Sequence, residues 1–95
     1  MNVSFTPKAK GNLRDIRHYI AQDDERAADR VISRIRQTAA MFEMFPLLGH
    51  EGEILGTREF KVTGLPYLII YRITLQTEVD ILTVIHSSRE HSKLT

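Results

Sequence analysis

Six side chains in the second half of the chain are of types that could together cleave RNA. Cleavage by an internal 2′-hydroxyl needs a base for that hydroxyl, cations for the charge that develops on the phosphorane, and an acid for the leaving oxygen. A carboxylate, a phenol and an imidazole are available for proton transfer, and three guanidinium groups are available for charge. These six residues are Glu59, Tyr71, His86, Arg58, Arg72 and Arg89.

Several of these residues also have an ordinary structural interpretation. Arg58 beside Glu59 can form an ion pair at the end of a strand. Tyr71 can lie in the core with its hydroxyl at the rim, and His86 can bond a backbone carbonyl where a strand ends. The sequence leaves both interpretations open.

The charge balance argues against a phosphate-lined surface. Thirteen basic and 12 acidic residues give a net charge of +1, and only Lys61 of the four lysines lies on the strand that carries Arg58. A protein that holds mRNA among phosphates is expected to carry several basic contacts. The four histidines lack the spacing of metal ligands, and no glycine-rich phosphate loop is present. We therefore expect no metal, no cofactor and no sequence-specific DNA binding by this chain.

Length and composition are typical of one small globular domain over residues 1–95. Hydrophobic residues make up 42% of the chain and charged residues 26%, which argues against disorder. There is no cysteine, so disulfides and thiolate metal sites are excluded. No apolar leader and no run of about 18 apolar residues is present. We expect a cytoplasmic protein without a membrane partner.

Two amphipathic helices are predicted in the first half of the chain. Thr6 and Pro7 suit an N-cap and a first helical position, and apolar residues recur every three or four positions over residues 7–21. The acidic residues 23–25 suit the start of a second helix, which Pro46 must end. The short acidic link predicts an antiparallel helical hairpin.

The second half of the chain predicts three strands. Residues 67–73 form the only seven-residue run dominated by β-branched and aromatic residues, which indicates a central strand apolar on both faces. Residues 57–63 and 78–86 alternate between apolar and polar, and short turns join all three strands. With a strand at residues 2–5, we predict an α+β fold of order β-α-α-β-β-β. Its helical hairpin would pack on one face of a small, mainly antiparallel sheet.

Some apolar surface has no obvious cover in this predicted fold. Met41, Met44 and Phe45 fall on the polar side of the second helix, away from its main apolar stripe. One helical hairpin can cover only one face of the central strand. The sheet or the following loop could wrap over the end of the helix, or a partner could bind there.

The ordered set of residues resembles the ParE/RelE superfamily of bacterial type II toxin–antitoxin systems, and the resemblance extends over nearly the whole chain. It rests on short pieces in both helices, in the loop after them and in the last three strands. These pieces are Phe5 with Ala9, Leu13, Ile16 and Tyr19–Ile20; Ala27–Ala28; Pro46 with Gly49; Gly56 with Arg58 and Glu59; Pro66, Tyr67 and Tyr71–Arg72; and Ile81, Leu82, Val84 and His86 through Arg89. The sequence of Arg58–Glu59, Tyr71–Arg72 and His86 to Arg89 is more similar to the ParE branch than to the ribosome-dependent nucleases. His50 departs from the family pattern, in which an arginine often follows the loop glycine.

The resemblance implies a toxin that a cognate, ParD-like antitoxin neutralises in a hetero-oligomer. The expected antitoxin-binding side chains lie on the second helix and the central strand: Met41, Met44, Phe45, Tyr67, Ile69 and Tyr71. The ParE-like pieces favour DNA gyrase as the target, inhibited without catalysis. The expected target-binding residues are Arg58, Arg72, His86 and Arg89. The alternative is a RelE-like, ribosome-dependent mRNA endoribonuclease that would use the six residues named first.

Overall fold

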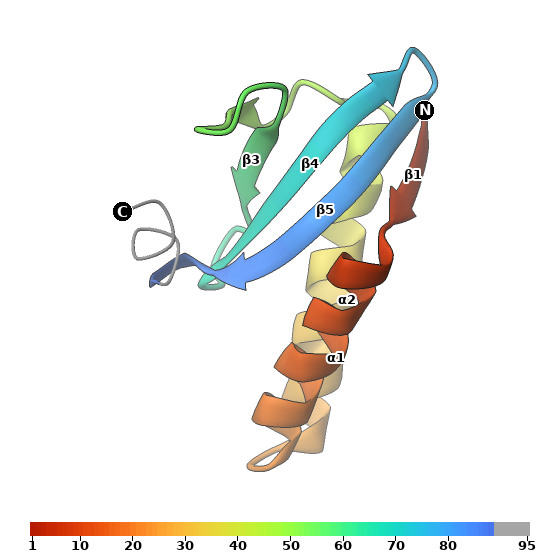
Figure 1. Ribbon diagram of the computed structural model, residues 1–95. Helices are drawn as coiled ribbons and strands as arrows, with labels where there is room; N and C mark the ends of the chain where they lie inside the picture. Colours follow the sequence, from red (N-terminus) through yellow and green to blue (C-terminus); the bar gives the residue numbers. More distant parts are fainter. Residues whose placement is uncertain (89–95) are drawn as a thin grey trace.

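The computed structural model describes residues 1–88 and shows two helices packed on one face of a five-stranded sheet (Figure 1). The strand order in the sheet is β1-β5-β4-β3-β2. The strands are β1 (Asn2–Phe5), β2 (His50–Glu51), β3 (Arg58–Lys61), β4 (Tyr67–Leu75) and β5 (Glu78–His86). Only β1 and β5 pair in parallel, and the other described pairs are antiparallel. The predicted α+β fold with a mainly antiparallel sheet is thus confirmed.

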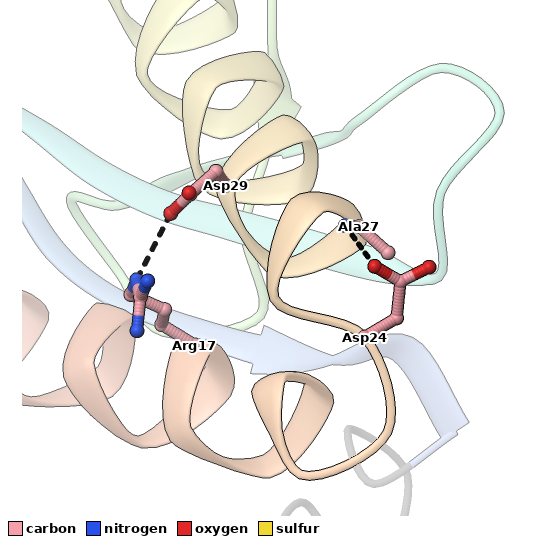
Figure 2. Close-up of polar contacts among 4 residues, drawn as sticks. All are labelled: Arg17, Asp24, Ala27 and Asp29. Atoms are coloured by element: carbon pink, nitrogen blue, oxygen red, sulfur yellow. Dashed lines mark hydrogen bonds and ion pairs between the residues drawn. The ribbon is translucent and has the colours of Figure 1, made fainter.

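The two helices begin where their capping residues predict. Helix α1 spans Pro7–Ala21, and the Thr6 hydroxyl accepts a backbone N–H of its first turn. Helix α2 spans Glu25–Ala40, and the Asp24 carboxylate accepts the Ala27 N–H at 3.0 Å (Figure 2). No helix within residues 1–88 is both long and apolar enough to span a membrane.

The helices form the predicted antiparallel hairpin, whose connecting end extends beyond the sheet (Figure 1). Arg17 Nε lies 3.0 Å from Asp29 Oδ1 and joins α1 to α2 in an exposed ion pair (Figure 2). The prediction placed the end of the second helix too late. Helix α2 ends at Ala40, and a short 3₁₀ helix, η1, spans Met41–Glu43. The tighter turn is typical of a helix terminus, where the last carbonyls lack partners in the next turn.

The core lies between the hairpin and the sheet. Phe42 at the end of the hairpin stacks on the Tyr71 ring of β4, with centroids 4.0 Å apart, and meets the Phe60 ring edge-on at 6.0 Å. Aliphatic side chains from both helices and from β4 and β5 fill the rest: Leu13, Ile35, Ile69, Val79, Ile81 and Val84. Burying these side chains contributes about 1.5–3 kcal/mol each.

One row of β4 side chains faces the helices, and this corrects a prediction. Tyr67, Ile69 and Tyr71 belong to the core, and the last two are completely buried. The prediction that these three form an open antitoxin-binding face is wrong, because side chains alternate along a strand and the hairpin covers this row. The row on the other face of the sheet consists of Leu68, Ile70 and Arg72.

Strand β5 contains a bulge at Leu82. Ile70 of β4 pairs with Thr83, whereas the next residue, Tyr71, pairs with Ile81. Leu82 is therefore an extra residue, and side chains on its two sides change faces relative to a regular strand. The strict alternation predicted for residues 78–86 fails at this point.

Two polar side chains of the α1 segment hold the bulge. The Thr6 hydroxyl donates to the Leu82 carbonyl at 3.1 Å. The Asn12 side-chain oxygen accepts the Val84 N–H at 3.0 Å and the Thr83 hydroxyl at 2.7 Å. These bonds satisfy backbone groups that the interrupted ladder leaves unpaired.

Candidate functional site

The Tyr71 hydroxyl anchors the loop that leads from η1 to β2. It accepts the Gly49 N–H at 2.9 Å and donates to the Pro46 carbonyl at 2.7 Å, while the ring is completely buried. A Cβ atom at Gly49 would lie 2.8 Å from this hydroxyl and 2.7 Å from the Glu59 carbonyl oxygen, so only glycine fits. Both hydrogen-bonding functions of the phenol are thus used within the fold.

Arg58 binds the same loop from the neighbouring strand. Its Nε and Nη2 atoms donate to the Gly49 carbonyl at 2.9 and 2.6 Å, and Nη2 also lies 3.4 Å from the Leu47 carbonyl. The suggested ion pair with Glu59 does not form, because the two side chains point to opposite faces of β3. The guanidinium group therefore positions a loop, and Glu51 of β2 lies opposite Arg58 in the β2–β3 register.

The Glu59 carboxylate lies beneath a second loop, formed by residues 52–57. Its side chain is only 6% exposed, and Oε2 accepts the Glu53 N–H at 3.3 Å. The loop is closed by the Thr57 hydroxyl, which donates to the Ile54 carbonyl at 2.6 Å, and by the Gly52 N–H, which donates to the Thr57 carbonyl at 2.8 Å. The carboxylate is thus covered and bonded to backbone. The sequence did not predict that this loop covers Glu59, because the loop residues show no helical or strand periodicity.

His86 and Arg72 lie far apart. His86 ends β5, where Nδ1 accepts the Ser88 N–H at 3.2 Å and its ring meets Tyr67 edge-on at 5.5 Å. Arg72 is exposed on the other face of the sheet, opposite Asp80 in the β4–β5 register. Strand rise places Asp80 and His86 about 20 Å apart along β5. The two basic residues cannot contact one small ligand together.

The six candidate residues therefore do not converge in the described part of the chain. Arg58 and Tyr71 hold one loop, and Glu59 lies under another. Arg72 makes no hydrogen bond or ion pair within residues 1–88, and Arg89 lies outside the described residues. Within the same range, no three histidine or acidic side chains gather closely enough to hold a metal.

Exposed apolar side chains recur in η1 and in the segment that follows it. Met41, Met44 and Phe45 are exposed, and Met44 is 80% exposed, so neither the sheet nor the following loop covers them. Leu47 and Leu48 extend the same surface into the loop. We call these five residues the η1 patch. Sequence reasoning missed its two leucines because they lie in a loop without periodicity. Five exposed apolar side chains within eight residues of sequence mark a candidate site for a protein partner.

Comparison with known proteins shows the family to which this chain is similar. Residues 3–91 match the family described as the ParE toxin of the type II toxin-antitoxin system parDE. A Sinorhizobium fredii protein named "Putative toxin Y4kP" is 38% identical over 88 residues, which are 93% of this chain and 90% of that protein.

Two solved structures share the fold. The chromosomal ParDE toxin–antitoxin system from P. aeruginosa matches with a TM-score of 0.79 at 21% identity. The toxin–antitoxin complex RelBE2 from Mycobacterium tuberculosis matches with a TM-score of 0.68 at 27% identity. Each comparison covers 90% of this chain and 95% of the other.

Proposed function

The chain belongs to the ParE toxin family of type II toxin–antitoxin systems, and from this membership we propose that it inhibits DNA gyrase by binding and is neutralised by a cognate antitoxin. One observation supports a mechanism without catalysis: the side chains of Arg58, Glu59 and Tyr71 already form hydrogen bonds with backbone groups of the fold. A nuclease needs an acid and a base that can reach its substrate. A binding inhibitor needs neither.

The η1 patch is the proposed surface for a ParD-like antitoxin. Met44 and Phe45 are large, exposed and adjacent in sequence, and burying each would contribute about 1.5–3 kcal/mol. The two related structures carry names of toxin–antitoxin systems or complexes, which supports a protein partner for this chain. The partner would convert an exposed apolar surface into the core of an interface.

The proposed gyrase-binding residues are now a distributed set. Arg72 presents an unpaired guanidinium on the open face of the sheet, within the described part of the chain. His86 lies at the distant end of β5, and Arg89 follows it in sequence. Arg58 holds a loop and could act only through that loop. Such spacing suits a broad protein surface in the cytoplasm better than a compact catalytic centre.

The RelE-like endoribonuclease remains the second candidate because of one comparison. The RelBE2 complex matches this chain at 27% identity over 90% of its length. Since Glu59 and Tyr71 already bond backbone groups, His86 would be the proton-transfer residue of such an enzyme. Arg72 would then have to act from the other face of the sheet, and this arrangement weakens the nuclease proposal.

Two assays with the same purified toxin separate the proposals. In a gyrase supercoiling reaction, we expect loss of supercoiling and accumulation of cleaved DNA. In a translation reaction, primer extension should detect no toxin-dependent mRNA cut. Adding the cognate antitoxin first should restore supercoiling. Site-specific mRNA cleavage together with normal gyrase activity would establish the second candidate instead.

A further inference from the structure

A groove of about 470 Å³ runs between α2 and the turn that joins β3 to β4. Its floor is apolar, formed by Ala27, Val31 and Leu65. Its rim is polar and includes two arginines and an amide: Arg30, Arg34 and Gln37. No acidic side chain among residues 1–88 lines it.

The groove has one fixed guanidinium and one unpaired guanidinium. Arg34 Nη2 donates to the Thr63 carbonyl at 2.6 Å, which holds the side chain against the turn. Gly64 in this turn has φ of +78°, a conformation that other residues rarely adopt. Arg30 is exposed and has no hydrogen-bond or ion-pair partner among residues 1–88.

Arginines on the opposite flank of α2 and on the facing side of α1 are already used within the fold. Arg17 pairs with Asp29, and the Arg36 guanidinium lies 5.4 Å from the centre of the Phe5 ring. Figure 2 shows Asp29 directed towards α1 and Ala27 on the other side of α2. The groove is therefore on the side of α2 where positive charge is left for a partner.

Charge and polarity together define the ligand that fits. Two guanidinium groups without a lining carboxylate attract an anionic group, and the apolar floor accepts an aliphatic or aromatic side chain. A nucleic acid backbone would satisfy the arginines and leave the apolar floor in contact with water. A peptide segment that combines acidic and apolar residues satisfies both.

The groove continues along α2 towards the η1 patch. Arg30, Arg34, Gln37 and Met41 follow one another at intervals of four, three and four residues, so they share one stripe of the helix surface. Helical rise separates Arg30 from Met41 by about 16 Å, or roughly three helical turns of a partner. One end of the stripe is cationic and the other end is apolar.

We infer that this stripe binds one segment of the antitoxin, with acidic residues on Arg30 and Arg34 and apolar residues on the η1 patch. The inference rests on the proposed function, because it takes the antitoxin as the partner. It adds a direction to that interaction, since the charge gradient along α2 admits the segment in one orientation.

Titration calorimetry of the toxin with its cognate antitoxin tests the charged end. Arg30→Glu should weaken binding at least about tenfold at an ionic strength of about 0.05 M, and by much less at about 0.5 M. Arg14→Glu is the matched control, because Arg14 is exposed on α1 and unpaired within residues 1–88. Met41→Glu should weaken binding at both ionic strengths. Equal effects of Arg30→Glu and Arg14→Glu would overturn the inference and leave the proposed function intact. An antitoxin that does not bind wild-type toxin would overturn both.

Crosslinking identifies the occupant directly. The chain has no cysteine, so Gln37→Cys can carry a single thiol-attached photocrosslinker, with Arg14→Cys as the matched site on α1. Irradiation of the complex should join Gln37→Cys to an antitoxin peptide that contains acidic residues. A crosslink to a second toxin, or to residues 89–95 of the same chain, would overturn the inference. A second result would also overturn it. In that result, duplex DNA binds the wild-type toxin but not the Arg30→Glu variant, while the antitoxin binds both proteins with equal affinity.

Discussion

The hydroxyl of Tyr71 accepts the backbone N–H of Gly49 at 2.9 Å, across 22 positions of sequence. The same hydroxyl donates to the Pro46 carbonyl, so a residue of the central strand fixes both ends of one turn. This turn contains Leu47 and Leu48 of the η1 patch. The position of the exposed patch therefore depends on a buried phenol, and stability and partner binding are linked through it.

Tyr71→Phe tests this link. Removing the hydroxyl leaves the Gly49 N–H and the Pro46 carbonyl without their partner, which should lower the free energy of unfolding by about 1–3 kcal/mol. Urea denaturation followed by circular dichroism measures the change. Tyr19→Phe is the control, because Tyr19 is 73% exposed on α1. Equal stability of the two variants would show that the bonds to the loop contribute nothing.

Gly49→Ala and Gly11→Ala should have opposite effects. At Gly49 the added methyl group would lie 2.7 Å from a backbone oxygen, so the loop must shift and the protein should lose at least about 1–3 kcal/mol. Gly11 lies inside α1 and its nearest contact would be 3.6 Å away, so alanine should stabilise by about 0.5–1 kcal/mol. Thermal unfolding of both variants is sufficient. A stable Gly49→Ala protein would contradict the tight packing described here.

Local sequence patterns predicted the helices and strands. Contacts between residues far apart in the sequence determined the features that those patterns did not predict. The caps at Thr6 and Asp24 and the β-branched and aromatic run at residues 67–73 are local signals, and they placed the helix starts and the central strand correctly. The bulge at Leu82 depends on α1 side chains more than 70 positions away, so strict alternation failed there. The prediction of a shared candidate site also missed contacts between residues far apart in the sequence.

Side-chain type alone does not show whether a polar group is free. Tyr71 and Arg58 have the chemistry of catalytic groups, but their partners are carbonyls of a loop without periodicity. The exposure of Met44 and Phe45 followed from helical spacing, which is a local property.

Asn12→Ala should destabilise the bulge of β5. The Val84 N–H and the Thr83 hydroxyl would lose their acceptor, at a cost of about 1–3 kcal/mol. The substitution should accelerate hydrogen exchange more at the Val84 amide than at the amides of β3. Asn2→Ala is the control, since the Asn2 side chain is exposed and makes no hydrogen bond within residues 1–88. Unchanged exchange at Val84 would mean that the backbone holds the bulge without Asn12.

Met44→Glu should separate binding from stability. Because Met44 is 80% exposed, a charge there should change the free energy of unfolding by less than about 0.5 kcal/mol. The antitoxin complex should lose about 1.5–3 kcal/mol, or roughly 10- to 100-fold in affinity. Leu75→Glu, at a 62% exposed apolar residue of β4, should leave affinity unchanged. If both variants bind normally, the η1 patch is not the interface.

The His86→Gln variant separates the two candidate targets. Glutamine can still accept the Ser88 N–H, but it cannot exchange a proton near neutral pH. If His86 transfers a proton in mRNA cleavage, the variant should lose about 10²- to 10⁴-fold in rate and still bind ribosomes. A gyrase inhibitor has no such step, so His86→Gln should reduce toxicity only gradually, through weaker binding to gyrase. Arg72→Glu should lose toxicity, because it reverses an exposed charge on the open face. We expect the gyrase outcome, measured as DNA breaks with intact mRNA after expression without antitoxin. The assignment would be reversed if the wild-type toxin cleaved mRNA and left DNA undamaged, and if the His86→Gln variant no longer cleaved mRNA.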